Sequence, residues 1–327
     1  MRILKSLKNK LPKALILLFL ICMLIFSDAT ILGASSGLLL WFHNVVPTLL
    51  PFIIISNLII RLNISGYISK VFHPFLGRLF GISREGCYPI VIGFLSGLPM
   101  GAKVSADLVL EKKISKEEGQ FLFAMCNNAS PMFIIGYISV TQLKLPHIKY
   151  ALFAIIYGSA ILGALLYRSF HKTKVEDNSI NSNHSANDSY PISKSKRFSF
   201  DLLDSSIMNG FEIVTRIGGY IILFSIIAQI MKEVLPGSGL IKASLMGILE
   251  ITTGISQISG TNSNLALKIV LIAALSSLGG LSGIAQTKSV LHNSRLSIQI
   301  YFFIKLLSAG IALLLALFYV TFFDFRL

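Results

Sequence analysis

The stretch of sequence that decides the fold is GFLSGLPMGAK at residues 93–103. It places Gly97, Pro99 and Gly101 inside an apolar segment that covers residues 87–110. A proline in a helix interior removes one backbone hydrogen bond, and neighbouring glycines weaken the helix further. Inside a membrane, the freed backbone groups must be buried in protein or face a water-filled cavity. We therefore predict that this segment is a broken or re-entrant helix.

The composition of the whole chain indicates a membrane protein. Of its 327 residues, 54% are hydrophobic and 13% are charged, against roughly 25% charged in a typical soluble domain. The mean hydropathy is +0.73, and about 20 apolar residues suffice for a helix to cross a bilayer. This excludes an ordinary soluble enzyme. Further candidate spans lie near residues 38–60, 121–140, 148–168, 210–231 and 298–322.

The N-terminal segment sets the expected orientation. An apolar run from Ala14 to Phe26 follows a basic start, and apolar sequence continues beyond it. An uncleaved transmembrane helix at residues 1–35 is favoured over a signal peptide, although Ala34 leaves cleavage open. The basic residues of this start, which should stay in the cytoplasm, are Arg2, Lys5, Lys8, Lys10 and Lys13.

The net charge of +14 fits basic cytoplasmic loops better than a nucleic-acid surface, so we expect no nucleic-acid partner. The same rule favours re-entry of residues 87–110 from the cytoplasm, because a full crossing would place the lysines and arginines of two later loops outside. One of those loops, residues 169–206, is rich in Ser and Asn and is predicted to be a polar cytoplasmic linker.

The linker separates two halves, residues 36–168 and 207–327, that show an internal repeat. A span, a broken segment and a span at 38–60, 87–110 and 121–140 recur in the same order at 210–231, 266–291 and 298–322. The spacing of Gly97 and Gly101 matches that of Gly279 and Gly283. Under the topology above, one repeat starts outside and the other inside, as in many transporters. The predicted fold is an all-α polytopic membrane protein with two inverted repeats that contain broken or re-entrant helices.

Polar groups at the interruptions of the first half are candidates for solute binding. Asn127 and Asn128 offer amide donors and acceptors at membrane depth. A break at Pro131 would leave unpaired N–H groups on the next half-helix, whose N-terminus attracts anions. With Ser130 and the backbone from Gly97 through Pro99 to Gly101, these residues form the predicted binding site.

Lys103 would supply a counter-charge to a solute at this site. A purely structural interpretation stays open for all of these residues: the prolines kink helices, the glycines allow close packing and Lys103 extends to the membrane interface.

The second half offers Ser282 and Gln286 on the opposite side of the predicted site. Glu250 is the one acid in its apolar stretch, and intramembrane carboxylates are functional candidates by default, so we predict a coupling or structural acid. His43 and Asn44 could line the pathway, but an anchor at the interface beside Trp41 is the favoured interpretation.

Enzyme signatures are absent from the sequence. It contains no nucleotide-binding loop, metalloprotease motif or nucleophile elbow. Cys22, Cys87 and Cys126 lack the spacing of metal ligands. We predict no catalytic residue, no metal and no cofactor.

Several of these blocks resemble the YlbJ family of sporulation integral membrane proteins, within the wider group that carries the nucleoside-recognition, or Gate, domain. The blocks are GFLSGLPMGAK at 93–103, ISKEE at 114–118, CNNASPMFI at 126–134 and LEITTG at 249–254. The resemblance implies endospore formation, distant kinship with concentrative nucleoside transporters and, for one branch, transport of dipicolinic acid across the outer forespore membrane.

We therefore expect a membrane transporter of a small polar anion, with dipicolinate as the solute that the resemblance suggests. The expected partners are that solute, the lipid bilayer, and further copies of the chain or other sporulation membrane proteins. The alternative is a non-transporting scaffold for a spore-envelope complex, and an intramembrane enzyme is a more distant one.

Overall fold

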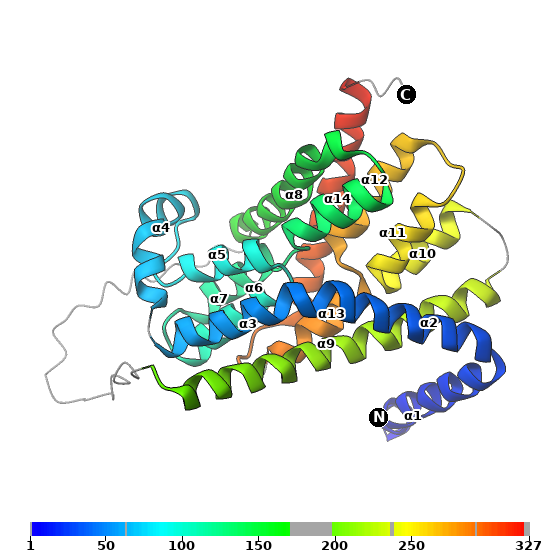
Figure 1. Ribbon diagram of the computed structural model, residues 1–327, viewed down its shortest axis with the longest axis horizontal. Helices are drawn as coiled ribbons and strands as arrows, with labels where there is room; N and C mark the ends of the chain where they lie inside the picture. The colour runs from blue at the N-terminus through cyan, green and yellow to red at the C-terminus, as the bar shows by residue number, and fades with distance from the viewer. Residues whose placement is uncertain (1, 63, 171–197, 236–238, 292, 324–327) are drawn as a thin grey trace, which may run out of the picture.

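The computed structural model describes residues 2–62, 64–170, 198–235, 239–291 and 293–323. Over these residues the chain forms helices and no β-strand (Figure 1). Four of the described helical segments are long and apolar enough to cross a membrane, and a fifth is added if one bent pair is counted. The prediction of an all-α polytopic membrane protein is confirmed. The four segments are Pro146–Phe170, Phe200–Val234, Leu265–Val290 and Ile298–Phe322.

The N-terminal region is divided at Phe26. Helix α1 (Arg2–Ile25) ends there, and α2 (Ser27–Leu40) starts at an angle of 102° to it. A π-helical turn, η1 (Trp41–Val45), leads from α2 directly into α3 (Val46–Arg61). Residues 27–35, which the sequence assigned to the N-terminal helix, therefore belong to the next long helical segment.

Helix α9 (Phe200–Val234) has 35 residues and runs antiparallel to the α2–α3 segment (Figure 1). Glycines permit the close approach: a methyl group on Gly33 would lie 2.7 Å from the Cα of Ile226, and one on Gly210 would lie 3.0 Å from Leu50. The Trp41 indole N–H also donates to the Val214 carbonyl at 2.8 Å. The two long segments thus cross the structure in opposite directions.

The first half continues with α4 (Ser65–Phe80) and then a hairpin of two short helices, α5 (Cys87–Ser96) and α6 (Met100–Leu110). A methyl group on Gly93 would lie 2.9 Å from the Cα of Gly101, so the two helices are antiparallel and in close contact. Each is about 15 Å long, half the hydrocarbon thickness. The segment at residues 87–110 therefore turns back at Gly97 instead of crossing.

A broken helix follows the first hairpin. Helix α7 (Lys116–Cys126) ends before the non-helical residues 127–130, and the chain then continues into the π-helical segment η2 (Phe133–Gln142). The half closes with the short helix η3 (Pro146–Ile148) and α8 (Lys149–Phe170).

The second half has the same order of elements after α9. A hairpin of α10 (Leu240–Leu249) and α11 (Ile251–Ser259) is followed by α12 (Leu265–Leu278) and α13 (Gly280–Val290), which are separated at Gly279, and by α14 (Ile298–Phe322). This order pairs the hairpin at 87–110 with the one at 240–259. The sequence had aligned it with 266–291, because glycine spacing alone does not distinguish a hairpin turn from a helix break.

The structure describes only the two ends of the polar linker predicted at residues 169–206. Residues 169–170 and 200–206 are helical. Residues 171–197 lie outside the described residues, and α9 already begins at Phe200. The Ser199 side chain accepts a hydrogen bond from the Leu202 N–H and caps this helix, and Asp201 lies in its first turn. Asp201, whose charge suited a polar linker, thus lies where a negative side chain stabilises the N-terminus of a helix.

Candidate solute-binding site

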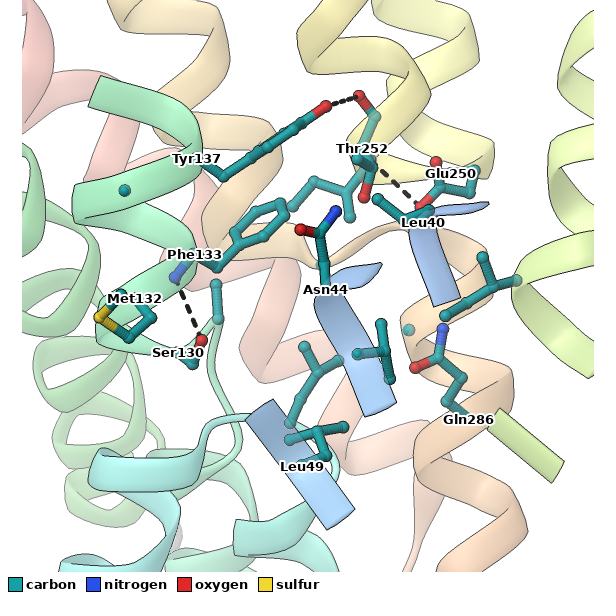
Figure 2. A pocket seen from close by; sticks show the side chains of 18 of the residues that line it. Leu40, Asn44, Leu49, Ser130, Met132, Phe133, Tyr137, Glu250, Thr252 and Gln286 are labelled. Atoms are coloured by element: carbon teal, nitrogen blue, oxygen red, sulfur yellow. Dashed lines mark hydrogen bonds between the residues drawn. The ribbon is translucent and has the colours of Figure 1, made fainter. Parts of the chain in front are cut away.

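A cavity of about 630 Å³ lies where both hairpin turns and both helix breaks meet. Its volume is in the range of pockets that enclose small organic molecules. Figure 2 shows side chains from both halves facing one another across it. The polar residues of its lining are His43, Asn44, Ser96, Ser130, Tyr137, Thr141, Glu250, Thr252 and Gln286.

The turn of the first hairpin forms part of the wall through Ser96 and Leu98. Gly97 has φ +80° and lies so close to Ser130 that a methyl group would come within 2.6 Å of the Ser130 nitrogen. The Leu98 N–H donates to the Asn128 carbonyl at 2.6 Å. The Ser96 hydroxyl is buried and has no hydrogen-bond partner. The hairpin turn and the helix break are thus joined backbone to backbone.

Three residues predicted at the site, Gly97, Pro99 and Gly101, shape this wall but are not among the residues that line the cavity. A methyl group on Gly101 would meet the Cys126 carbonyl group. The glycines allow the hairpin to pack on α7, which is the structural interpretation that the sequence had left open.

Asn127 and Asn128 lie behind the wall. The Asn127 amide donates to the Thr287 hydroxyl at 2.8 Å and to the Tyr301 hydroxyl at 2.9 Å, while its side-chain oxygen is buried without a partner. Asn128 donates to the Met125 carbonyl at 2.7 Å and accepts from the Lys305 ammonium at 2.6 Å. Both amides thus hold the break in place, and neither contacts the cavity directly.

Lys103, which the sequence predicted as a counter-charge to the solute, lies away from the cavity. Its ammonium forms an ion pair with Asp107 at 2.8 Å and donates to the Asn57 side chain at 3.0 Å. The side chain is buried away from the cavity lining. Because Asp107 follows at i+4 on the same helical face, its carboxylate neutralises the charge locally.

Ser130 does line the cavity, together with two aromatic side chains of η2 (Figure 2). Its hydroxyl accepts from the Phe133 N–H at 3.2 Å and so caps the resumed helix. Phe133 and Tyr137 stack with their ring centres 5.0 Å apart, and the Tyr137 hydroxyl donates to the Thr252 carbonyl at 3.1 Å. This last bond connects the break of the first half with the hairpin of the second.

Glu250 lies in the turn of the second hairpin and lines the cavity. Its two carboxylate oxygens accept from the N–H groups of Thr252, at 3.1 Å, and Thr253, at 2.7 Å. A carboxylate at a helix N-terminus is stabilised by these donors and by the helix dipole. The structure therefore gives Glu250 a structural role as a cap; a coupling role stays a prediction.

Gln286 completes the polar lining from α13. Its amide donates to the Ser282 hydroxyl at 3.0 Å, so the predicted Ser282 orients Gln286 from behind the surface. On the same helix, a methyl group on Gly283 would lie 3.0 Å from the Leu98 side chain of the first hairpin. The first hairpin and α13 thus approach each other directly at this wall.

The sequence interpretation underrated His43 and Asn44 and overlooked Lys305. His43 and Asn44 line the cavity, although an interfacial anchor was favoured; Trp41 beside them is bound to α9. Lys305 was overlooked because α14 resembled a plain span. The available signal was that Lys305 is the one charged residue in the apolar sequence 298–322, and such residues mark functional candidates.

The fold and the cavity define an all-α polytopic membrane protein with a central chamber formed by interrupted helices. The chain is similar to the sporulation integral membrane protein YlbJ of Bacillus subtilis (strain 168), with 25% identity over 313 residues that cover 86% of this chain and 75% of that protein. This likeness supports the resemblance to the YlbJ family. No family model and no solved structure matches the chain.

Proposed function

We propose that the protein is a membrane transporter of a small polar anion, with dipicolinic acid as its solute, and that it acts during endospore formation in the outer forespore membrane. The observation that carries this proposal is the cavity of about 630 Å³ at the meeting point of two hairpin turns and two helix breaks. Interrupted backbone at membrane depth is tolerated where it lines such a chamber, and transporters place their sites there.

The repeated order of elements supports a transporter with inverted repeats. Each half contains, in this order, a long helical segment, a hairpin, a broken helix and a further helix, and the first half has α4 in addition. The long segments of the two halves, α2–α3 and α9, run antiparallel. Two equivalent units of opposite orientation around one chamber provide a physical basis for alternating access.

The lining favours recognition by hydrogen bonds. Among the described residues that line the cavity there is no lysine or arginine, so an anion would be held by donors such as Asn44, Gln286 and Ser130. The N-termini of the helices that begin after Ser130 and after Gly279 add partial positive charge. The Glu250 carboxylate is already occupied by two N–H donors of its own helix.

The sporulation context rests on the similarity to YlbJ, which is described as a sporulation integral membrane protein. We propose membership of the YlbJ family and of the Gate-domain group on the same similarity and on the sequence blocks given above. Further copies of the chain, or other sporulation membrane proteins, are the proposed protein partners.

The test is uptake of labelled dipicolinate into liposomes that contain the purified protein, compared with empty liposomes. We expect saturable uptake that falls at least several-fold in Gln286→Ala. The exposed ion pair of Glu212 and Arg216, 2.7 Å apart, provides a matched control, and Glu212→Gln should transport like the wild type. Absence of uptake by protein shown to be folded would contradict the proposal and favour the scaffold.

A further inference from the structure

Among the residues whose burial the structure describes, two lysines are buried, and their surroundings differ. Lys103 and Lys305 are 5% and 2% exposed. The Lys103 ammonium is neutralised by Asp107 at 2.8 Å. Lys305 takes part in no ion pair within the described part of the chain; its ammonium donates to the Asn128 side-chain oxygen at 2.6 Å and lies 5.6 Å from the centre of the Tyr301 ring. A buried cation is costly without an opposite charge, so this difference needs an explanation.

The described helices that pack around Lys305 contain no acidic residue that pairs with its ammonium. Helix α14 packs against α7, α8, α12 and α13. Of these five helices, only α7 contains acidic residues, and these lie in its first turn, where Glu118 accepts from the Ser83 N–H at 2.6 Å. The titratable groups close to Lys305 or to the break that it supports are Cys126 of α7, Tyr157 of α8 and Tyr301 of α14.

The basic groups on the same helices are engaged elsewhere or point outward. Arg168 of α8 donates to the carbonyls of Phe80 and Gly81. Lys268 of α12 donates to the Ser259 carbonyl at 3.0 Å, and Lys149 of α8 lies 4.9 Å from the centre of the Tyr150 ring. Lys116 of α7 and Lys288 of α13 are exposed. Lys305 is therefore an isolated buried amine in a neutral polar environment.

A short series of hydrogen bonds connects this amine to the cavity wall. Lys305 donates to the Asn128 side chain, and the Asn128 backbone carbonyl accepts from the Leu98 N–H. Leu98 lines the cavity, as do Ala129 and Ser130, which directly follow Asn128. A change in the position or charge of the Lys305 amine would therefore alter the hydrogen bonds that hold the first hairpin turn and the helix break.

We propose that Lys305 is the proton-binding group that couples passage of the solute to movement of a proton, which rests on the proposed transport function. Loss of the Lys103 proton would leave the partly buried Asp107 carboxylate without its counter-charge. The partner of Lys305 is a neutral amide, which accepts a hydrogen bond from an ammonium or an amine alike. Lys305 can therefore release its proton without leaving a charge unpaired.

In the proposed cycle, the nitrogen lone pair of Lys305 takes a proton from water on one side of the membrane, and the ammonium returns it to water on the other side. Asn128 binds the buried amine, so in this cycle displacement of residues 127–130 as the solute passes gives water access to it. No other group changes its bonds in this step.

The first experiment needs no solute. The melting temperature of the detergent-solubilised protein is measured from about pH 5 to about pH 9 for the wild type and Lys305→Gln, with Lys103→Arg as the matched control. If Lys305 exchanges a proton in the folded state, the difference between wild type and Lys305→Gln varies with pH. The control retains the ion pair and should parallel the wild type. A difference that is constant across this range would overturn the proposal.

The second experiment measures coupling in liposomes with the membrane potential clamped at zero. With one proton moved per solute, a pH difference of one unit should sustain about a tenfold gradient of dipicolinate. Lys305→Gln and Lys305→Arg should still exchange dipicolinate but lose the response to pH, whereas Lys103→Arg keeps it.

The two proposals fail in different ways. A folded wild-type protein that exchanges no dipicolinate contradicts the proposed function, and the melting experiment then still shows whether Lys305 exchanges a proton in the folded state. The role of Lys305 is overturned if dipicolinate exchange by the wild type does not respond to the pH gradient. It is also overturned if Lys305→Gln still responds to that gradient. Either result leaves the proposed transport function intact.

Discussion

The two helix breaks that form the chamber are held in different ways. The first, at residues 127–130, relies on side chains from elsewhere: the Tyr157 hydroxyl lies 2.9 Å from the Phe94 carbonyl and 3.1 Å from the Ala129 carbonyl, and Lys305 holds Asn128. The second consists of Gly279 and Gly280, at φ +81° and +67°, and the adjoining hairpin turn is capped from within by Glu250.

This difference indicates that the two helix breaks differ in how easily they can change conformation. A break that depends on hydrogen bonds from α8 and α14 can change when those bonds change. A break made by two adjacent glycines beside a self-capped turn does not depend on hydrogen bonds of this kind. We infer that the first break is the responsive wall of the chamber and the second is the fixed wall.

The largest expected effect concerns the fixed wall. In Gly254→Ala, the new methyl group would overlap backbone atoms of Gly247 on the other arm of the hairpin. Overpacking costs about 1–3 kcal/mol where side chains can adjust and more where backbone must move, so we expect a sharp loss of folded protein. Gly310→Ala, where no atom lies within 4 Å, should behave like the wild type. Size-exclusion profiles and melting temperatures measure both, and a stable Gly254→Ala protein would contradict this packing.

The next effect concerns the responsive wall. Tyr157→Phe removes the hydroxyl near the Phe94 and Ala129 carbonyls and leaves those buried acceptors without this donor. An unsatisfied buried group costs about 1–3 kcal/mol, so thermal unfolding should occur at a lower temperature. Tyr150, which is 69% exposed, provides the control Tyr150→Phe. Equal melting temperatures for the two variants would show that the first break does not depend on α8.

The smallest effect separates capping from solute binding. Glu250→Ala and Asn264→Ala each remove the cap of a helix in the second half, at a cost of about 1 kcal/mol. Only Glu250 also lines the cavity. Both variants should melt at similarly reduced temperatures, while only Glu250→Ala should change the affinity for dipicolinate in a binding titration. Equal affinities in the two variants would restrict Glu250 to its cap.

The sequence was sufficient for much of the fold because hydropathy and helix-breaking residues act locally. The apolar runs predicted the spans, and the glycines and proline at residues 97–101 predicted the turn of the first hairpin. The bend at Phe26 was missed, since no glycine or proline marks it, and the start of α9 was missed because capping residues also suit a linker.

The candidate site was predictable only in part. Ser130, Glu250 and Gln286 do line the cavity, and each is a polar residue at or near an interruption. Whether a polar side chain faces the chamber or supports the wall depends on partners distant in sequence. Asn127 reaches Thr287, and Asn128 reaches Lys305; neither contact follows from local pattern. The ion pair of Lys103 with Asp107 differs from these contacts. It could have been predicted from the sequence, because Asp107 lies one helical turn from Lys103.

We infer that the helix interruptions line a chamber filled with water. This inference is tested most directly by the reaction of Ser130→Cys with a charged, membrane-impermeant thiol reagent, in a protein whose Cys22, Cys87 and Cys126 are replaced by serine. Leu314→Cys on α14, a side chain that is 64% exposed in the structure and expected to face lipid, is the matched control. We expect rapid modification at position 130 and none at position 314; an unreactive thiol at position 130 would contradict a water-filled chamber.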